Sequence, residues 1–159
     1  MSALGGSDKT DERWMARALE QALQAGADGE VPVGAVVVRG EGVVATGRNT
    51  MVKSGDALQH AELRALRAAI EKLGAPRLEE CTIYVTLEPC AMCAGAIVLA
   101  RVGRVVFGAF DDKAGMAGSV ADLLRHKKLN HRPEVRAGLM AEASAALLRE
   151  FFAARREQG

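Results

Sequence analysis

The strongest constraint on the fold is a pair of strand-like runs separated by one helical segment. Thr82–Leu87 (TIYVTL) and Val105–Gly108 (VVFG) are rich in β-branched and aromatic residues, which is typical of buried strands. Between them, Pro89 opens a predicted helix that ends at Ala100, because a proline fits the first helical turn. Strands joined by a crossover helix usually lie parallel in one sheet, so this pattern predicts an α/β fold.

The rest of the chain adds helices and strands to the same sheet. A β-hairpin is predicted where Gly34–Arg39 and Val43–Thr46 flank a Gly-Glu-Gly turn at 40–42. The other predicted elements are helices at Asp11–Ala25, His60–Leu73, Ser119–Leu124 and Glu142–Arg156, a strand around Val135 and a polar loop at 47–59. With helices on both faces, the expected architecture is a three-layer α/β/α sandwich around a central mixed five-stranded sheet.

The composition indicates one globular domain. The chain has 159 residues, 49% hydrophobic and 26% charged, and this balance is typical of a soluble protein. Residues 1–10 are predicted to form a flexible N-terminal tail, and residues 11–159 a single domain. No apolar stretch approaches the roughly 20 residues of a membrane span, and the N-terminus lacks a basic head followed by an apolar run. We therefore expect a cytoplasmic protein that does not enter a membrane.

One charged segment is a candidate surface for a nucleic acid. The formal net charge is only +1, so a nucleic-acid partner requires a local basic patch. Segment 125–136 (RHKKLNHRPEVR) sets five basic side chains against Glu134. A solvated surface is the alternative reading of such a run. His126 and His131 have no cysteine neighbours and are expected not to bind metal.

The cysteines indicate metal or redox chemistry. Cys81, Cys90 and Cys93 are an odd number, too few for a disulfide framework. Residues at i and i+3 share one face of a helix, so the sulfurs of Cys90 and Cys93 can occupy adjacent corners of a tetrahedron. His60 opens another helix at the same end of the sheet and can supply a third ligand. Three protein ligands leave the fourth position to water, as in catalytic zinc sites. A redox pair is the alternative, but it explains neither His60 nor Pro89.

Glu62 follows the candidate ligand His60 by two residues. Zinc lowers the pKa of a bound water to about 7, and a neighbouring carboxylate can take that proton. Glu62 is therefore predicted to carry protons in a hydrolytic deamination, in which water attacks the carbon that bears an amine and ammonia leaves. The alternative is that Glu62 is an ordinary carboxylate on the surface of a helix.

These residues resemble the zinc-dependent cytidine and nucleotide deaminases, whose signature is H-x-E followed by P-C-x-x-C. Within that superfamily, the chain is similar to the bacterial tRNA adenosine deaminases over nearly all of its length beyond the first ten residues. The likeness is carried by EVPVGAVVV at 30–38, HAELRALR at 60–67, YVTLEPCAMCAGA at 84–96, GRVVFGAFDDKAGMAGS at 103–119, LNHRPEV at 129–135 and ALLREFFAARR at 146–156.

The resemblance implies a fold, a cofactor and a reaction. The fold is cytidine deaminase-like, and one Zn²⁺ per subunit is held by His60, Cys90 and Cys93. The reaction is the hydrolytic conversion of the wobble adenosine (A34) of a tRNA anticodon to inosine. The implied partner is the anticodon arm of an arginine tRNA with an ACG anticodon. A homodimer with active sites near the subunit interface is implied as well.

The resemblance also assigns substrate contacts. Asn49 is expected to hydrogen-bond the flipped purine, and Asp111 to contact the nucleotide chain near it. Residues implied to line the anticodon-loop side are Phe151, Phe152, Arg155 and Arg156. From the residues alone, Asn49 can instead serve a turn, and at least one of the two adjacent phenylalanines is expected to pack inward.

Some positions differ from the family pattern, and some alternatives stay open. The differing residues are Leu58 and Gln59 before the ligand histidine, Arg48 and Thr50 beside Asn49, and Phe110 before Asp111. The apolar helix at 91–100 is either internal or faces a partner subunit. Two rival functions are a deaminase of free bases or nucleosides and a non-catalytic, zinc-stabilised RNA-binding module. The basic loop and the aromatic, basic C-terminal helix favour an RNA substrate over a free base.

Overall fold

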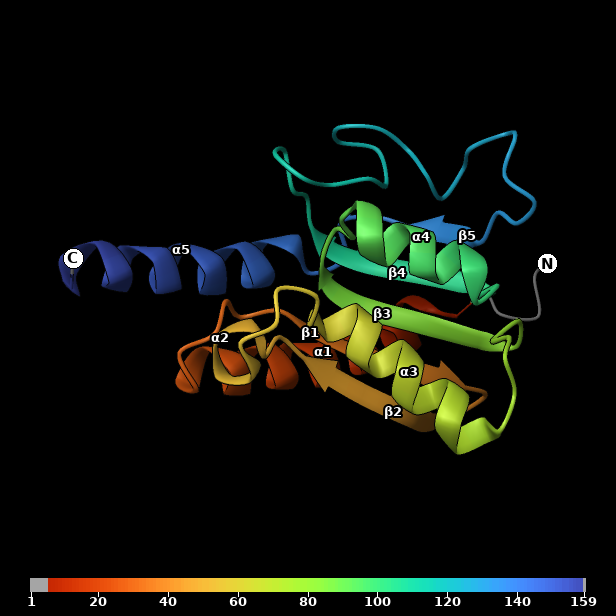
Figure 1. Ribbon diagram of the computed structural model, residues 1–159, viewed down its shortest axis with the longest axis horizontal. Helices are drawn as coiled ribbons and strands as arrows, with labels where there is room; N and C mark the ends of the chain where they lie inside the picture. Colours follow the sequence, from red (N-terminus) through yellow and green to blue (C-terminus); the bar gives the residue numbers. More distant parts are fainter. Residues whose placement is uncertain (1–5, 159) are drawn as a thin grey trace.

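A mixed five-stranded sheet forms the centre of the protein, as the sequence predicts. The computed structural model describes residues 6–158, and Figure 1 shows their arrangement. The strands, in the order they lie across the sheet, are β2 (Gly42–Arg48), β1 (Gly34–Arg39), β3 (Cys81–Leu87), β4 (Arg104–Ala109) and β5 (Glu134–Arg136). β1 is antiparallel to β2 and β3, whereas β4 is parallel to both β3 and β5.

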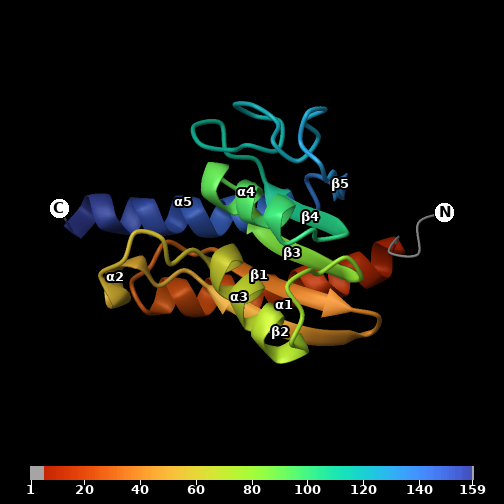
Figure 2. The same cartoon turned by 45° about the vertical axis from the view of Figure 1, so that its right-hand side comes forward.

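Helices cover both faces of this sheet, so the three-layer architecture is confirmed. One face carries α1 (Asp8–Ala27) and the start of α5 (Ala141–Gln158), and the other carries α3 (Ala61–Leu73) and α4 (Ala91–Leu99). A short helix, α2 (Met51–Ser54), lies beyond the end of β2. In Figures 1 and 2, α5 extends past the edge of the sheet.

Alternating side chains of the strands build one core on each face. Val37, Ile83 and Val105 pack with α3 and α4, whereas Val36 and Val106 pack with α1. This is the alternation expected of strands covered on both sides. Among the described residues, no helix is long and apolar enough to span a membrane.

Two glycines let helices lie unusually close to the hairpin. A Cβ atom on Gly34 would collide with the backbone of α1 at Ala18, and one on Gly47 with the backbone of α3 at Ala61. The close approach of α3 fixes where that helix begins relative to β2.

A buried ionic cluster ties α1 to the sheet. Asp11 is fully buried and accepts a bidentate pair of hydrogen bonds from Arg104, both 2.8 Å long. The hydroxyl of Tyr84 donates to the same carboxylate at 2.7 Å, and Arg136 donates at 2.8 Å. Burial alone would raise the pKa of Asp11, but the hydrogen bonds from Arg104, Tyr84 and Arg136 lower it below 3.8.

The first helix is longer than predicted. It begins at Asp8 rather than Asp11, because the hydroxyl of Ser7 accepts a hydrogen bond from the backbone of Thr10 and caps the helix. It continues to Ala27, two residues past the predicted end. Residues 8–10 of the predicted tail are therefore helical, and residues 1–5 of that tail lie outside the described residues.

Three other local predictions were wrong. Pro89 precedes the N-cap of α4, which is Cys90, and does not lie in the first turn. The predicted helix at Ser119–Leu124 is absent from the described chain, because this segment turns back and pairs Ala117 with Asp122. The loop predicted at 47–59 contains α2, whose first backbone N–H groups are held by a distant carboxylate, Glu30.

The apolar α4 is not wholly internal to one chain. Cys93, Ile97 and Val98 are buried against the sheet. Leu99, in contrast, is 83% exposed. The helix is therefore internal on one side only, and a contact between α4 and a partner subunit stays a prediction.

Candidate active site

Three candidate metal ligands meet where α3 and α4 begin. β2 and β3 run in the same direction, because both are antiparallel to β1, so the segments that follow them emerge at one edge of the sheet. His60 is the N-cap of α3, and Cys90 is the N-cap of α4. The Nδ1 atom of His60 lies 3.6 Å from the sulfur of Cys90 and 3.6 Å from that of Cys93.

The spacing of these atoms fits a tetrahedral metal ion. All three ligand atoms lie within 4.8 Å of one another. Zinc binds imidazole nitrogen at about 2.0–2.1 Å and thiolate sulfur at about 2.3 Å, and atoms on two such corners are about 3.6 Å apart. The nitrogen and sulfur donors are also those that zinc prefers. The group could therefore hold a metal ion.

The electrostatics of the cluster favour thiolate at Cys90. A hydrogen bond from Cys93 is the main cause that lowers the pKa of Cys90 to about 3. Burial opposes this shift, and a hydrogen bond from His60 adds to it. The same contact with Cys90 raises the pKa of His60. The pKa of Cys93 is raised by its hydrogen bond to Cys90 and by burial. A metal ion that binds here therefore displaces protons from Cys93 and His60.

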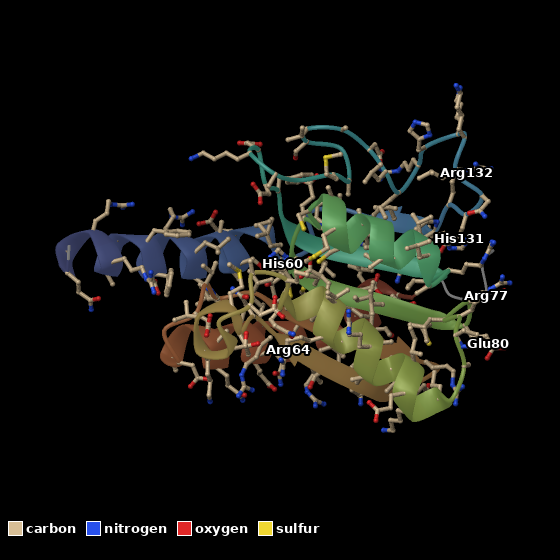
Figure 3. All side chains as sticks on the ribbon, in the orientation of Figure 1. His60, Arg64, Arg77, Glu80, His131 and Arg132 are labelled. Carbon is tan, nitrogen blue, oxygen red and sulfur yellow. The ribbon has the colours of Figure 1, made fainter. Side chains whose placement is uncertain are left out.

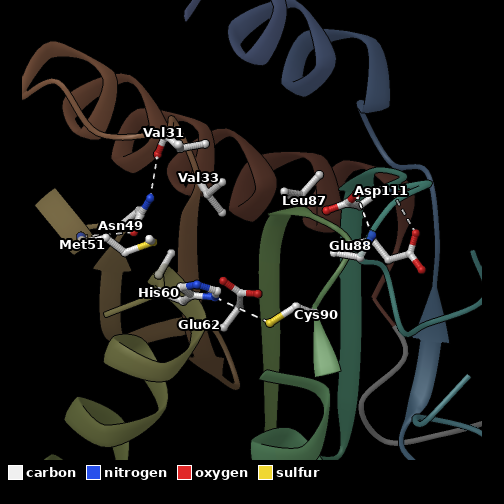
Figure 4. A pocket seen from close by; sticks show the side chains of 12 residues that line it. Val31, Val33, Asn49, Met51, His60, Glu62, Leu87, Glu88, Cys90 and Asp111 are labelled. Carbon is white, nitrogen blue, oxygen red and sulfur yellow. Dashed lines mark hydrogen bonds between the residues drawn. The ribbon is translucent and has the colours of Figure 1, made fainter. Parts of the chain in front are cut away.

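Glu62 lies beside the cluster in the first turn of α3. Its side chain is buried, and this desolvation raises the pKa of the carboxyl to about 7. A carboxyl with that pKa exchanges protons readily at neutral pH. It lines the same pocket as His60 and Cys90, as Figure 4 shows.

The pocket over the cluster has a volume of about 180 Å³. Asn49 forms one wall, where its amide makes two long hydrogen bonds of 3.4 Å, to the carbonyl oxygen of Val31 and from the backbone N–H of Met51. Asp111 forms the opposite wall and accepts hydrogen bonds from the N–H groups of Lys113 and Ala114. Both predicted substrate contacts thus line the pocket, on either side of Glu62 (Figure 4).

A buried glutamate that the sequence analysis missed anchors the wall containing Asp111. Glu88 accepts hydrogen bonds of 3.0 Å from the backbone N–H groups of Asp111, Ala117 and Ser119, and one from the Ser119 hydroxyl. A Cβ atom on Gly115 would collide with its carboxylate. The only signal in the sequence was its place directly before Pro89 and Cys90.

The predicted contacts on α5 lie outside the pocket. Phe151 is partly buried, and the guanidinium of Arg155 lies 4.9 Å from the centre of its ring. Phe152 is 44% exposed and lines a separate cavity together with Lys113 and Arg156. The loop at 111–114 divides that cavity from the pocket, so these side chains flank the site.

The basic segment at 125–136 lies away from the pocket. Figure 3 shows Arg132 and His131 at the right-hand side of the molecule, apart from His60 near its centre. Arg125 is paired with Asp122, and Arg136 with the buried Asp11. Within one chain, this run therefore does not adjoin the pocket, and its role as an RNA surface stays a prediction.

The remaining histidines and Cys81 make local contacts away from the candidate metal ligands. A ring nitrogen of His131 lies 2.7 Å from the carbonyl oxygen of Val102. His126 accepts a hydrogen bond from the backbone of Lys128. Cys81 is buried in the core.

Comparison with known proteins agrees with this geometry. The profile of the MafB19-like deaminase family matches residues 9–156. The tRNA-specific adenosine deaminase of Bacillus subtilis (strain 168) is 44% identical over 142 residues, which are 89% of this chain and 88% of that protein.

Solved structures extend the likeness to three dimensions. A structure from a study of A-to-I editing by tRNA A34 deaminases at the wobble position has a TM-score of 0.82 and 41% identity, over 86% of this chain and 99% of the other. A guanine deaminase from Nitrosomonas europaea has a TM-score of 0.73 and 28% identity, over 89% of this chain and 84% of the other. The chain therefore belongs to the MafB19-like deaminase family and, within it, to the tRNA-specific adenosine deaminases.

Proposed function

We propose that this protein is a zinc-dependent hydrolase that converts the wobble adenosine of a tRNA anticodon to inosine and releases ammonia. The observation that carries the proposal is the placement of the buried Glu62 beside a His60–Cys90–Cys93 group in one pocket. The curated relatives that are named tRNA-specific adenosine deaminases support the choice of substrate.

Glu62 moves the protons of the reaction. His60, Cys90 and Cys93 would hold a zinc ion, which would supply Lewis-acid activation of water. Glu62 takes one proton from the attacking water and gives it to the ring nitrogen next to the amine-bearing carbon. It then carries the second proton from the new hydroxyl to the amine, which leaves as ammonia while the carbonyl forms.

The pocket selects an unstacked base. Its volume of about 180 Å³ accommodates a single base, so the adenosine has to leave its stack to enter. Asn49 hydrogen-bonds the purine, and Asp111 contacts the nucleotide chain at the opposite wall. An anticodon loop offers such a base without the cost of opening a duplex. The arginine tRNA with an ACG anticodon is the proposed substrate.

The side chains flanking the pocket suit RNA. Phe151 and Phe152 offer aromatic surfaces, and Arg155 and Arg156 offer guanidinium groups that pair with phosphates or stack on bases. We place these side chains on the anticodon-loop side. Because the proposed substrate is a tRNA, the cytoplasm is the proposed compartment.

A homodimer is part of the proposal. The exposed Leu99 lies on the apolar α4, and an exposed apolar side chain of this size gains free energy when a second subunit covers it. The exposed part of α4 is the proposed subunit interface.

The test is inosine formation in an anticodon stem-loop of arginine tRNA with adenosine at the wobble position. Zinc-loaded wild type is expected to form inosine, whereas Glu62→Ala should retain zinc without turnover. If the zinc-loaded wild type deaminates guanine or cytidine but not the stem-loop, the protein is a free-base or nucleoside deaminase instead. RNA binding without any ammonia release would indicate a binding module.

A further inference from the structure

A second cavity lies behind one wall of the catalytic pocket. Asn49 and Met51 line the catalytic pocket, whereas their neighbours in the same segment line the second cavity. The second cavity has a volume of about 360 Å³. We call it the basic cavity, after its lining residues Arg48, Thr50, Lys53, Ser54 and Arg64.

The lining of the basic cavity suits an oxyanion. Three cationic side chains face it, against one carboxylate, that of Asp28. The hydroxyls of Thr50 and Ser54 add hydrogen-bonding groups, and all other lining residues are polar or glycine. Cationic side chains together with hydroxyls are the usual partners of phosphate groups.

The Arg64 guanidinium and the backbone of Lys53 are held in place before any ligand arrives. The guanidinium of Arg64 donates to the Thr50 hydroxyl at 3.0 Å and to the Gln59 side chain at 3.3 Å, two neutral acceptors that leave its positive charge uncompensated. The backbone N–H of Lys53 is bound to the buried Glu30 at 2.8 Å, which fixes where the lysine side chain starts.

Arg48 has a different role in the cavity. It donates to Gln24 at 2.6 Å and lies 3.7 Å from a carboxylate oxygen of Asp28, so its charge is partly compensated. Lys53 and Arg64 therefore supply the positive charge that a ligand can use.

The basic cavity is also close to the reacting centre. The backbone N–H of Arg64 donates to the carbonyl oxygen of His60, so Arg64 follows the candidate ligand by one helical turn, about 6 Å along the helix axis. Figure 3 shows Arg64 and His60 in the same part of the molecule, far from Arg132. Residues of the segment 48–53 line both cavities, so a phosphate that flanks a base bound over His60 can reach Lys53 and Arg64.

We propose that the basic cavity binds a backbone phosphate of the RNA strand next to the flipped adenosine, through Lys53 and Arg64. The inference rests on the proposed RNA substrate. It places phosphate recognition at Lys53 and Arg64 and assigns no such role to the basic segment at 125–136.

The test measures the affinity for the anticodon stem-loop as a function of salt concentration, in the non-hydrolysing Glu62→Ala background. Adding Lys53→Ala and Arg64→Ala is expected to weaken binding roughly tenfold at low salt. The plot of the logarithm of the association constant against the logarithm of the salt concentration should become less steep by about 1. The charge-conserving pair Lys53→Arg and Arg64→Lys should restore the slope, which separates charge from a loss of folding.

The matched control is the pair Lys127→Ala and Lys128→Ala, which removes the same charge from the distant basic segment. The inference is overturned if the alanine variants of the basic cavity bind with the affinity and slope of the background, or if the control pair has the same effect as they do. Inosine formation by wild type on the same stem-loop tests the proposed function separately. If the wild type forms inosine but the alanine variants keep the salt dependence of the background, the phosphate site is contradicted and the proposed function stands.

Discussion

At the scale of single residues, Glu62 shows how a group fitted for proton transfer weakens the fold. Its pKa of about 7 results from burial, which disfavours the charged form. The pKa in the folded chain is therefore above the ordinary value of 4.5. The stabilising contribution of the protonated form is complete below pH 4.5 and is lost as the pH rises through 7.

This cost is measurable in the metal-free protein. Glu62→Gln removes the charge but keeps the shape, so at pH 8 it should raise the free energy of unfolding by up to about 3 kcal/mol relative to wild type. At pH 4 both side chains are neutral, and the difference should vanish. Urea unfolding in the presence of a chelator at both pH values checks this. Equal stability at pH 8 would mean that Glu62 ionises without a penalty.

Glu88 is expected to act as a positioning residue. In Glu88→Gln, an amide NH₂ would face backbone N–H groups, so the loop carrying Asp111 should lose its geometry and KM for the stem-loop should rise about tenfold or more. Gly115→Ala reaches the same loop by steric conflict with the Glu88 carboxylate and should give the same result.

Two readouts separate this role from general damage. Zinc content should remain one ion per chain in both variants, because the proposed metal ligands lie at the starts of α3 and α4 and not in this loop. Gly42→Ala is the control, since its new Cβ atom would meet nothing closer than 4.0 Å. An unchanged KM in Glu88→Gln would show that the loop does not need this anchor.

The residues of the site differ in how well the sequence reveals them. His60, Cys90 and Cys93 were predictable because metal ligation requires fixed residue types at fixed spacing, and the structure brings them together. Glu88 and Glu30 were not predictable in the same way. A carboxylate that holds distant backbone N–H groups has the same appearance in a sequence as a solvated one, and its partners are set only by the tertiary fold.

At the scale of elements, the ionic cluster at Asp11 joins α1 to β3, β4 and β5. Asp11→Asn leaves Arg104 in the interior without its counter-charge, so it should cost about 3–5 kcal/mol in the free energy of unfolding. Denaturant unfolding at pH 7 measures this. The exposed pair Arg17–Glu20 is the control, and breaking it should cost less than about 1 kcal/mol.

The same cluster predicts a dependence on acidity. The pKa of Asp11 is lowered in the folded protein. Its contribution to the free energy of unfolding is therefore complete above pH 3.8, and it is lost as the pH falls through the lower pKa of the folded state. The stability difference between wild type and Asp11→Asn should therefore narrow in acid.

The elements themselves were predictable where local pattern decides. β3, β4, α3 and α4 begin and end within two residues of their predictions, because strand and helix periodicity is a property of neighbouring side chains. The helix predicted at 119–124 was wrong, because the backbone N–H of Ser119 donates to the distant Glu88 and the segment does not form a helix. α2 was missed for the corresponding reason, because Glu30 binds its first N–H groups.

At the scale of the whole molecule, the exposed Leu99 on α4 gives a test of the proposed homodimer. Leu99→Arg should place a charge in the proposed subunit interface and shift the protein to a monomer at micromolar concentration. Sedimentation velocity measures the mass. Leu23→Arg is the control, because Leu23 is also exposed but lies on α1. A dimer that survives Leu99→Arg would place the interface elsewhere.

The reach of the Asp11 cluster along the chain has a consequence for biosynthesis. Asp11 is 93 residues from Arg104 and 125 from Arg136. At roughly 5–20 residues per second, the first helix leaves the ribosome roughly 6 to 25 seconds before its last partner. During that interval its apolar face, including Trp14 and Met15, has no completed sheet to cover it. The ionic cluster that holds α1 is therefore completed only after β5 has been synthesised, and nascent chains that end before residue 136 expose this apolar face.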